Sequence, residues 1–286
     1  MIASEALKKF QDDRRIIHRT HGRGEGITRL VSPHDLGQLI KPFVFLDRVD
    51  IPAIPKEKLD QFMKEYYHPH SGIATVTTLL SGDVRFEDTT GRSGTLPAGG
   101  IECMQAGGGV WHTGAVLGPG RARGFQLWIA LRPELENGPA VSSYLQPEDV
   151  ESDGHVRVIL GSYGKARSRL LPTSQANYLH VRLKAGERWS YQPPTEHNVA
   201  WIASYDGDLE VSGLVLNREI AVFEEGTQEI KVVAREDVDF VLGSAVKHPY
   251  PLALGMYSVH TSPKALAIGE ARIDEIEKTV FQAQTN

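Results

Sequence analysis

The stretch HPHSGIATVTTLLSGDV, residues 68–84, sets the fold class because it reads as a strand that enters a tight turn and continues as a new strand. Its apolar run ends at Gly82 and Asp83, a pair that is typical of a hairpin turn. Short strands separated by such turn residues predict an all-β sandwich or barrel. Comparable apolar runs, most of them bounded by Gly, Pro, Asp or Ser, occur at residues 84–86, 101–104, 125–131, 178–183, 199–202, 209–211, 221–223, 230–233 and 240–242.

A weaker copy of this pattern occurs in the second half of the chain, where residues 198–205 lead into a second Gly-Asp turn at Gly207. Gly99 follows Gly82 by 17 residues, and Gly226 follows Gly207 by 19 residues. Gly-Asp hairpins are common in β proteins, but two features that recur at nearly matching spacing favour a duplicated unit. The sequence therefore predicts that one strand–turn–strand unit is built twice.

The boundary between the two copies is expected within residues 133–154, a segment rich in Pro, Ser, Asp and Glu. We therefore expect an N-terminal domain of residues 1–145 and a C-terminal domain of residues 146–286. Helical periodicity is largely confined to the end of the chain. There Ser262 and Pro263 read as an N-cap followed by proline at the first helical position, and residues 272–282 read as a polar, amphipathic helix.

Composition and charge exclude several classes of protein. The 286 residues are 41% hydrophobic and 23% charged, which is typical of a globular chain long enough for two ordinary domains. A net charge of −5 carries no basic excess for phosphate contacts, so no nucleic acid is expected as a direct partner. No apolar run approaches the length of a membrane span, and residues 1–15 have no apolar core segment, so no secretory signal is expected. Cys103 has no second cysteine to pair with, so a reducing, cytoplasmic location is expected.

Three histidines form a candidate metal site. In an extended segment, residues two apart point to the same face, so His68 and His70 can aim both imidazoles at one point. Pro69 between them predicts an edge strand or the beginning of a strand. His112 follows a glycine-rich turn, and neutral imidazoles suit Fe, Cu, Ni or Zn. Three imidazoles with an open position would make a catalytic site. From the spacing alone, surface or hydrogen-bonded histidines are an equally good interpretation.

The second copy provides an internal control. Counting back from Gly207 gives Pro193 and Thr195 where the first copy has its two histidines. His197 is nearby, but a lone histidine is more often structural than a ligand. We therefore expect the C-terminal domain to lack metal ligands.

The first half of the chain has an ordered combination of motifs at Pro42–Asp47, His68–Gly72, Thr75–Thr77, Leu80–Val84, Glu87–Asp88, Gly91, Pro97–Gly99, Met104, Ala106–Gly109 and His112. This combination resembles the core signature of the pirin family, most strongly over residues 40–130. The resemblance implies a bicupin, that is, two tandem cupin-type β-barrels with a metal ion in the N-terminal one, here followed by a short C-terminal helix.

The resemblance also implies ligands. His68, His70 and His112 match three of the four metal ligands of pirins, with Fe²⁺ the first expectation and Zn, Cu, Ni or Co as alternatives. The fourth ligand is a glutamate two residues after the third histidine, and that position is Gly114 here. A second acidic position of the family is Ala74 here. Because a carboxylate helps to hold the cation, we expect a weaker or even an empty site.

Two other acids are candidates to replace the missing carboxylate. Glu102 shares a strand face with Met104 and could point into the barrel, although an outward, solvated glutamate is the favoured interpretation. Glu65, three residues before His68, is a weaker candidate. Trp111 and Trp128 are expected to fill the core, though either could wall a pocket for an aromatic ligand.

Some pirins cleave the flavonol quercetin with dioxygen, so the resemblance implies a metal-dependent dioxygenase of the quercetin 2,3-dioxygenase type with a small aromatic substrate. The alternative is a non-catalytic bicupin that acts as a partner-binding regulator or as a metal or redox sensor, with a protein partner that the sequence does not identify. A metal-free cupin is a third possibility. The sequence leaves open which of these three the protein is.

Overall fold

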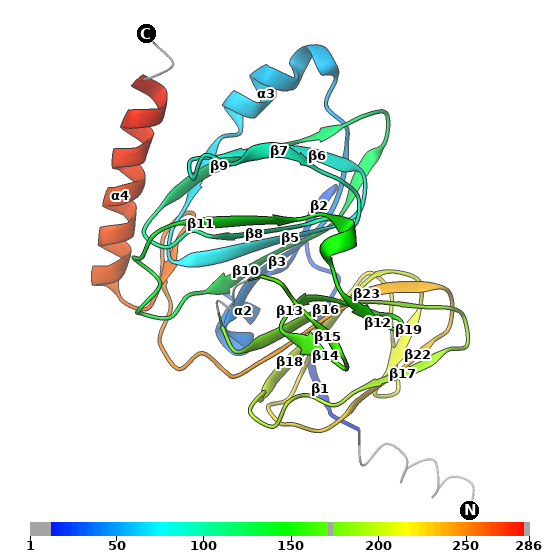
Figure 1. Cartoon of the computed structure of the whole chain (residues 1–286). Coiled ribbons are helices and arrows are strands. Elements are labelled where there is room, and N and C mark those ends of the chain that lie inside the picture. The colour runs from blue at the N-terminus through cyan, green and yellow to red at the C-terminus, as the bar shows by residue number, and fades with distance from the viewer. Residues whose placement is uncertain (1–12, 171–173, 283–286) are drawn as a thin grey trace, which may run out of the picture. The chain divides into compact units, whose positions relative to one another are not determined.

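The computed structural model describes residues 13–170 and 174–282. This part of the chain is mostly β-strand (Figure 1), as the sequence predicts, and each of the expected apolar runs lies largely within a strand. The chain folds as two compact units. We call one the histidine unit, formed by residues 24–150 and 248–282, and the other the companion unit, formed by residues 13–23 and 151–247.

The compact units differ from the expected continuous domains at both ends of the chain. The expected boundary between residues 145 and 146 lies five residues before the division between Val150 and Glu151. Residues 13–23, however, belong to the companion unit, and residues 248–282 belong to the histidine unit. Such exchanges depend on contacts between residues far apart in sequence, which no local pattern reveals. The cupin domains 1–145 and 146–286 therefore stay a prediction.

The histidine unit contains two antiparallel sheets whose inner faces enclose its interior. The six-stranded sheet has the order β11 (Val141–Leu145), β8 (Ile101–Gln105), β5 (Ile73–Ser81), β10 (Arg121–Ala130), β3 (Phe43–Pro52), β2 (Ile27–Val31). The four-stranded sheet has the order β4 (His68–His70), β9 (Val110–Leu117), β6 (Asp83–Asp88), β7 (Ser93–Leu96). The remaining elements are α2 (Leu36–Ile40), η1 (Lys56–Lys58), α3 (Leu59–Glu65), η2 (Pro147–Asp149), the ribbon β24 (Ala253–Leu254) and β25 (Val259–His260), and α4 (Pro263–Gln282).

The companion unit is built from the same two kinds of sheet. Its seven-stranded sheet has the order β1 (Ile16–Thr20), β21 (Ile220–Phe223), β18 (Val199–Asp206), β23 (Val238–Ala245), β16 (Ala176–Leu183), β13 (Val156–Leu160), β12 (Ser152–Asp153). Its four-stranded sheet has the order β17 (Arg188–Tyr191), β22 (Ile230–Ala234), β19 (Leu209–Val211), β20 (Leu214–Leu216), and a small ribbon joins β14 (Ser162–Tyr163) to β15 (Ala166–Arg167).

The strand order confirms the duplication that the sequence predicts. In each unit the strand before the Gly-Asp turn is central in the larger sheet, and the strand after the turn lies in the four-stranded sheet. Gly82 and Gly207 have φ angles of 78° and 79°, a conformation that glycine adopts without steric cost. The pairing of β5 with β10 and that of β18 with β23 also slip at the same place, just before these glycines. The molecule therefore consists of two cupin-type barrels followed by a C-terminal helix.

Apolar residues fill much of the interior of both barrels. An apolar core joins both sheets of the companion unit, with members that include Leu179, Ile202 and Leu242. In the histidine unit, apolar clusters form around Val44, Leu79 and Met104.

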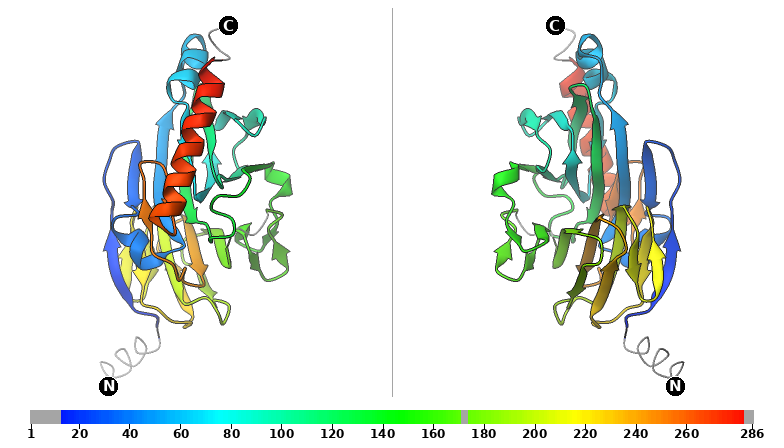
Figure 2. Two further views of the ribbon diagram at one scale, coloured as in Figure 1. Left: turned by 90° about the vertical axis from the view of Figure 1, so that its left-hand side faces the viewer. Right: turned by 90° about the vertical axis from the view of Figure 1, so that its right-hand side faces the viewer.

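The C-terminal helix begins where the sequence predicts and lies against β9 (Figures 1 and 2). The Ser262 hydroxyl accepts a hydrogen bond of 3.2 Å from the Ala265 backbone N–H, as an N-cap does, and Pro263 is the first helical residue. Helix α4 has 20 residues and confirms the expected C-terminal helix. The Trp111 indole donates a 3.0 Å hydrogen bond to the Ile273 carbonyl, which ties α4 to β9. None of the helices described is long and apolar enough to cross a membrane.

Candidate metal centre

The structure brings the three predicted histidines together. Strand β4 pairs antiparallel with β9, and this register places His68 directly opposite His112. His70 follows on the same face of β4. One nitrogen of each ring can be chosen so that all three atoms lie within 4.8 Å of one another. As the sequence predicts from Pro69, β4 is the edge strand of its sheet.

Backbone carbonyls orient two of the three rings. His68 Nδ1 lies 2.9 Å from the Tyr66 carbonyl oxygen, and His70 Nδ1 lies 3.0 Å from the Tyr257 carbonyl oxygen. A carbonyl can only accept a hydrogen bond, so these Nδ1 atoms carry the protons. Each Nε2 atom is therefore left with a lone pair. The same arrangement is typical of metal-ligating histidines, whose second nitrogen is held by an oxygen.

The surroundings keep these imidazoles neutral. Burial, reinforced by His112, lowers the pKa of His68 from its ordinary value to about 4. Burial, followed by the effects of His112 and His68, lowers the pKa of His70 well below its usual range. Both rings therefore carry a single proton and no charge at neutral pH. A neutral imidazole is the form that binds a metal ion.

Glu102 corrects the interpretation that the sequence favours. The side chain is not solvated on the outside of the barrel, since Glu102 is only 8% exposed and lines the interior cavity. Its Oε2 atom accepts a 3.0 Å hydrogen bond from the Thr77 hydroxyl. Its Oε1 atom lies 3.5 Å from His112 Nδ1. Alternation along β8 allowed either face, and only the pairing with β5 shows which face lines the barrel.

Other candidate residues do not join the centre. Glu65 is exposed at the end of α3. Cys103 is buried, and burial raises the pKa of its thiol to about 12, so it stays protonated and behaves as a small apolar side chain. Gly114 lines the cavity two residues after His112 but offers no ligand.

A cavity of about 310 Å³ lies next to the three histidines and is bounded by both sheets. Trp128 lines it, stacks on Phe45 at a centroid distance of 4.0 Å and meets the edge of the His70 ring. Trp128 therefore walls a pocket, whereas Trp111 anchors α4. The cavity has a mainly apolar wall with a few polar groups, which is typical of small-molecule sites. Its apolar lining includes Ile27, Phe45, Val49, Ile51, Leu79, Val84, Phe86, Val116, Ala122, Phe125 and Trp128.

The donor set fits a divalent transition-metal ion. In the described part of the chain, His112 Nε2 and Glu102 Oε1 are buried without a hydrogen-bond partner. Unpaired buried polar atoms are rare, because leaving them unsatisfied is unfavourable. An ion among the three imidazoles would satisfy His112 Nε2. Imidazole nitrogens suit Fe, Ni, Cu or Zn.

In the described part of the companion unit, the positions equivalent to the three histidines hold other residues. Strand pairing places Tyr191 and Ile230 where the histidine unit has His68 and His112, and Pro193 where it has His70. Counting back from Gly207 gives Pro193 and Thr195 for His68 and His70, which is two residues later in the chain than strand pairing gives. The reason is that the segment before Gly207 is two residues longer than the segment before Gly82. Among the described residues, the group of three close ligand atoms in the histidine unit is the one that could hold a metal ion.

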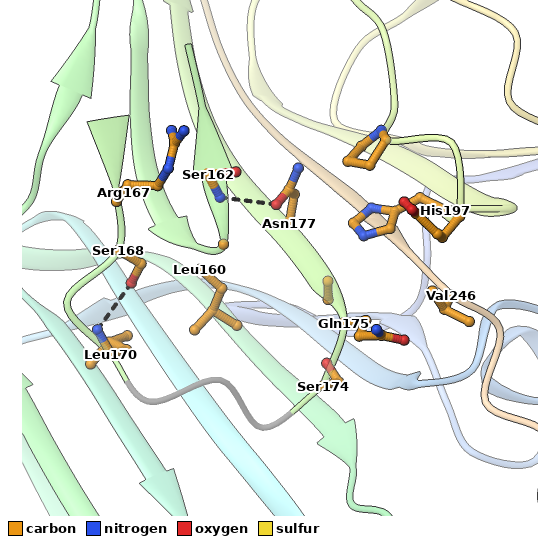
Figure 3. A pocket seen from close by; sticks show the side chains of 14 residues that line it. Leu160, Ser162, Arg167, Ser168, Leu170, Ser174, Gln175, Asn177, His197 and Val246 are labelled. Carbon is orange, nitrogen blue, oxygen red and sulfur yellow. Dashed lines mark hydrogen bonds between the residues drawn. The ribbon is translucent and has the colours of Figure 1, made fainter. Parts of the chain in front are cut away.

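A second cavity, of about 540 Å³, lies in the companion unit (Figure 3). Two of the polar side chains that line it, Asn177 and His197, make hydrogen bonds within the unit. Asn177 accepts a 2.9 Å hydrogen bond from the Ser162 backbone N–H, and His197 Nδ1 lies 2.9 Å from the Ser244 hydroxyl. The hydrogen bond of His197 agrees with a structural role, which stays a prediction.

Comparisons with known proteins agree with this architecture. The family model described as Pirin matches residues 25–129. The chain is 31% identical over 248 residues to "Putative quercetin 2,3-dioxygenase PA3240" of Pseudomonas aeruginosa, a match that covers 80% of this chain and 84% of that relative.

Two solved structures share the fold. The crystal structure of quercetin 2,3-dioxygenase from Acinetobacter baumannii superposes with a TM-score of 0.79 at 23% identity, covering 93% of this chain and 98% of that one. The bacterial pirin YhhW from Escherichia coli, in complex with nickel(II), superposes with a TM-score of 0.60 at 19% identity, covering 82% and 98%. Taken with the sequence match over four fifths of its length, these findings show that the chain belongs to the pirin family.

Proposed function

We propose that this protein is a metal-dependent dioxygenase of the quercetin 2,3-dioxygenase type that acts on a flavonol-like aromatic substrate. The observation that carries the proposal is the convergence of three imidazoles, from His68, His70 and His112, on the wall of a mainly apolar cavity. The relative from Pseudomonas aeruginosa, whose name refers to this activity, supports the same reaction class.

The chain's own residues suit such a substrate. The cavity volume of about 310 Å³ is at the lower end of the range for small-molecule sites. Trp128 and Phe125 offer aromatic surfaces against which a planar ring system can pack. The apolar wall excludes water, which strengthens polar interactions near the histidines. The carbonyls of Tyr66 and Tyr257 keep two imidazoles in one orientation.

A divalent ion held by the three histidines would supply a Lewis-acidic centre for substrate oxygens. Fe²⁺ is our first expectation, and the nickel(II) complex of the Escherichia coli pirin makes Ni²⁺ a strong alternative. Zn, Cu and Co also suit imidazole ligands. We expect the protein to act in the cytoplasm.

The test combines metal content with turnover. The purified protein is loaded separately with iron, nickel, copper or cobalt, bound metal is measured by elemental analysis, and quercetin consumption is followed by loss of its near-visible absorbance. We expect bound metal and turnover with at least one ion, and loss of both in His112→Ala. The exposed His34→Ala is the matched control and should retain both. Absence of turnover with every ion would rule out this activity.

A non-catalytic bicupin that senses a metal or binds a partner is the second candidate. Gly114 favours it, because this position supplies no carboxylate to take a proton from a phenolic substrate. Bound metal without quercetin turnover, together with a partner interaction that depends on His112, would support this candidate. A protein without bound metal in metal-rich medium would instead be a cupin that has lost its site.

A further inference from the structure

A row of polar side chains crosses the six-stranded sheet of the histidine unit at one level. Strand pairing places Asp47 opposite Gln126, Gln126 opposite Thr77, and Thr77 opposite Glu102. All four side chains line the cavity. Asp47 at one end is paired with Arg29, and Glu102 at the other end faces His112.

The companion unit shows that the fold does not require this row. At the same distance from the Gly-Asp turn, its strands place Leu179, Leu242, Ile202 and Ala221 opposite one another. All four belong to its apolar core. Because burying polar groups is unfavourable unless they are satisfied, aliphatic residues are the stable choice at this level. The polar row in the histidine unit therefore serves the site and not the barrel.

The hydrogen bonds in this row have a direction. The Thr77 hydroxyl lies 3.0 Å from Glu102 Oε2 and 2.6 Å from Gln126 Oε1. A hydroxyl has a single proton, so it can donate to only one of these two acceptors. Turning the Gln126 amide by 180° would place its NH₂ group against the Thr77 oxygen, so that Gln126 donates to Thr77 and Thr77 donates to Glu102. The row thus holds the carboxylate of Glu102 in place from one side.

The other carboxylate oxygen completes the arrangement of the third histidine. Glu102 Oε1 is buried, has no hydrogen-bond partner among the described residues and lies 3.5 Å from His112 Nδ1. A proton on Nδ1 would be attracted to this carboxylate oxygen and would leave Nε2 with its lone pair. His112 would then match His68 and His70, whose Nδ1 atoms face carbonyl oxygens.

We propose that Glu102 is the positioning residue of the metal centre and its negatively charged group. In the metal-bound protein its Oε1 atom accepts a hydrogen bond from His112 Nδ1–H, favours the tautomer that leaves the Nε2 lone pair for the ion, and offsets part of the charge of a dication held by neutral imidazoles. Glu102 therefore takes over the electrostatic role of the carboxylate missing at Gly114, from a different strand. This inference rests on the proposed metal site but not on the proposed activity.

The experiment measures metal affinity rather than activity. Ni²⁺ and Co²⁺ are titrated into wild-type protein and the Glu102→Gln variant in competition with a chromophoric chelator. Loss of an outer oxygen partner of a ligating histidine typically weakens metal binding roughly 10- to 100-fold, and we expect a loss in this range. The absorption spectrum of the Co²⁺ protein should also change. The exposed Glu65→Gln removes the same charge near His68 and should alter neither affinity nor spectrum.

Unchanged affinity and an unchanged Co²⁺ spectrum in Glu102→Gln would overturn the inference. If that variant does not fold, Thr77→Val provides the second test, because it removes the donor that holds Oε2 and should weaken binding several-fold. An unchanged affinity in Thr77→Val would then count against the proposal. A wild-type protein that binds neither ion would refute it as well.

The two proposals fail separately. Weakened metal binding in Glu102→Gln together with no quercetin turnover by the wild-type protein would leave the positioning role in place and remove the dioxygenase. Quercetin turnover by the wild-type protein together with unchanged metal binding in Glu102→Gln would support the dioxygenase and remove the positioning role.

Discussion

Gly114 shows how a single residue shapes the metal centre. It lies two residues after His112 in β9, so a side chain at this position would project from the same face. A Cβ atom there would lie 3.2 Å from Val84 Cγ1 and 3.6 Å from the Arg85 carbonyl oxygen. The nearer contact is with the end of a side chain, which can shift slightly. A larger residue therefore fits with modest repacking.

We predict that Gly114→Glu raises the affinity for Ni²⁺ and Co²⁺, because it adds a charged oxygen donor beside His112. The gain should be at least tenfold, corresponding to about 1.4 kcal/mol, as measured by chelator competition. Gly114→Ala is the matched control, since it adds the Cβ atom without a donor and should not tighten binding. An affinity unchanged by the glutamate would mean that position 114 does not face the ion.

At the scale of elements, a buried polar cluster fastens the segment before α4 to the strand that carries the histidines. The Ser71 hydroxyl lies 2.9 Å from His260 Nε2, and His260 Nδ1 lies 3.3 Å from Glu136 Oε2. Glu136 also accepts hydrogen bonds from the Thr261 backbone N–H and hydroxyl, at 2.6 and 2.7 Å. The order Ser–His–Glu resembles a hydrolytic triad. Because Ser71 is completely buried, however, no substrate can reach its hydroxyl.

This cluster predicts a stability effect. Glu136→Gln replaces a carboxylate that accepts two hydrogen bonds by an amide whose NH₂ group cannot accept one. We expect the free energy of unfolding to fall by about 1–3 kcal/mol, measured by urea denaturation. Glu134→Gln removes the same charge two residues away at an exposed site and should change stability by less than about 0.5 kcal/mol. Equal effects of both variants would argue against a buried anchor.

At the scale of the whole molecule, buried histidines link stability to pH. In the described part of the chain, burial is the main cause that lowers the pKa of six histidines: His68, His70, His180, His197, His248 and His260. In the unfolded chain these histidines are protonated near the ordinary pKa of 6.5, whereas in the folded protein they are protonated only at lower pH. Their contribution to the free energy of unfolding should therefore be fully present above pH 6.5 and decrease as the pH falls toward 4.

His248 allows this linkage to be measured away from the metal centre, because burial lowers its pKa to about 4. The contribution of this residue alone should reduce the free energy of unfolding by up to roughly 2 kcal/mol between pH 7 and pH 5. Urea denaturation at both pH values should show a smaller difference in His248→Gln than in the wild-type protein. The exposed His34→Gln should keep the wild-type difference. A dependence on pH that is identical in both variants would contradict this account.

The sequence by itself determined the strand content, the duplicated unit and the three histidines. These features depend on local signals, because alternation, Gly-Asp turns and an N-cap followed by proline act within a few residues. Gly82 and Gly207 mark equivalent turns, and Ser262 with Pro263 marks the start of α4. The direction of the Glu102 side chain was not accessible in this way, since a strand has two faces and alternation does not say which one lines a barrel.

Only the tertiary structure decided which distant segments pair. Strand β1 joins β21, some 200 residues away in sequence, and residues 248–282 return to the histidine unit. Strand pairing also identified the companion-unit residues that correspond to His68 and His70, two positions before those found by counting from Gly207. An insertion in the segment before the turn changes the number of residues but not the strand register. The same pairing aligned Asp47, Gln126, Thr77 and Glu102 across four strands. Such a row exists only in the folded sheet, because backbone hydrogen bonds between strands set the register and local sequence does not.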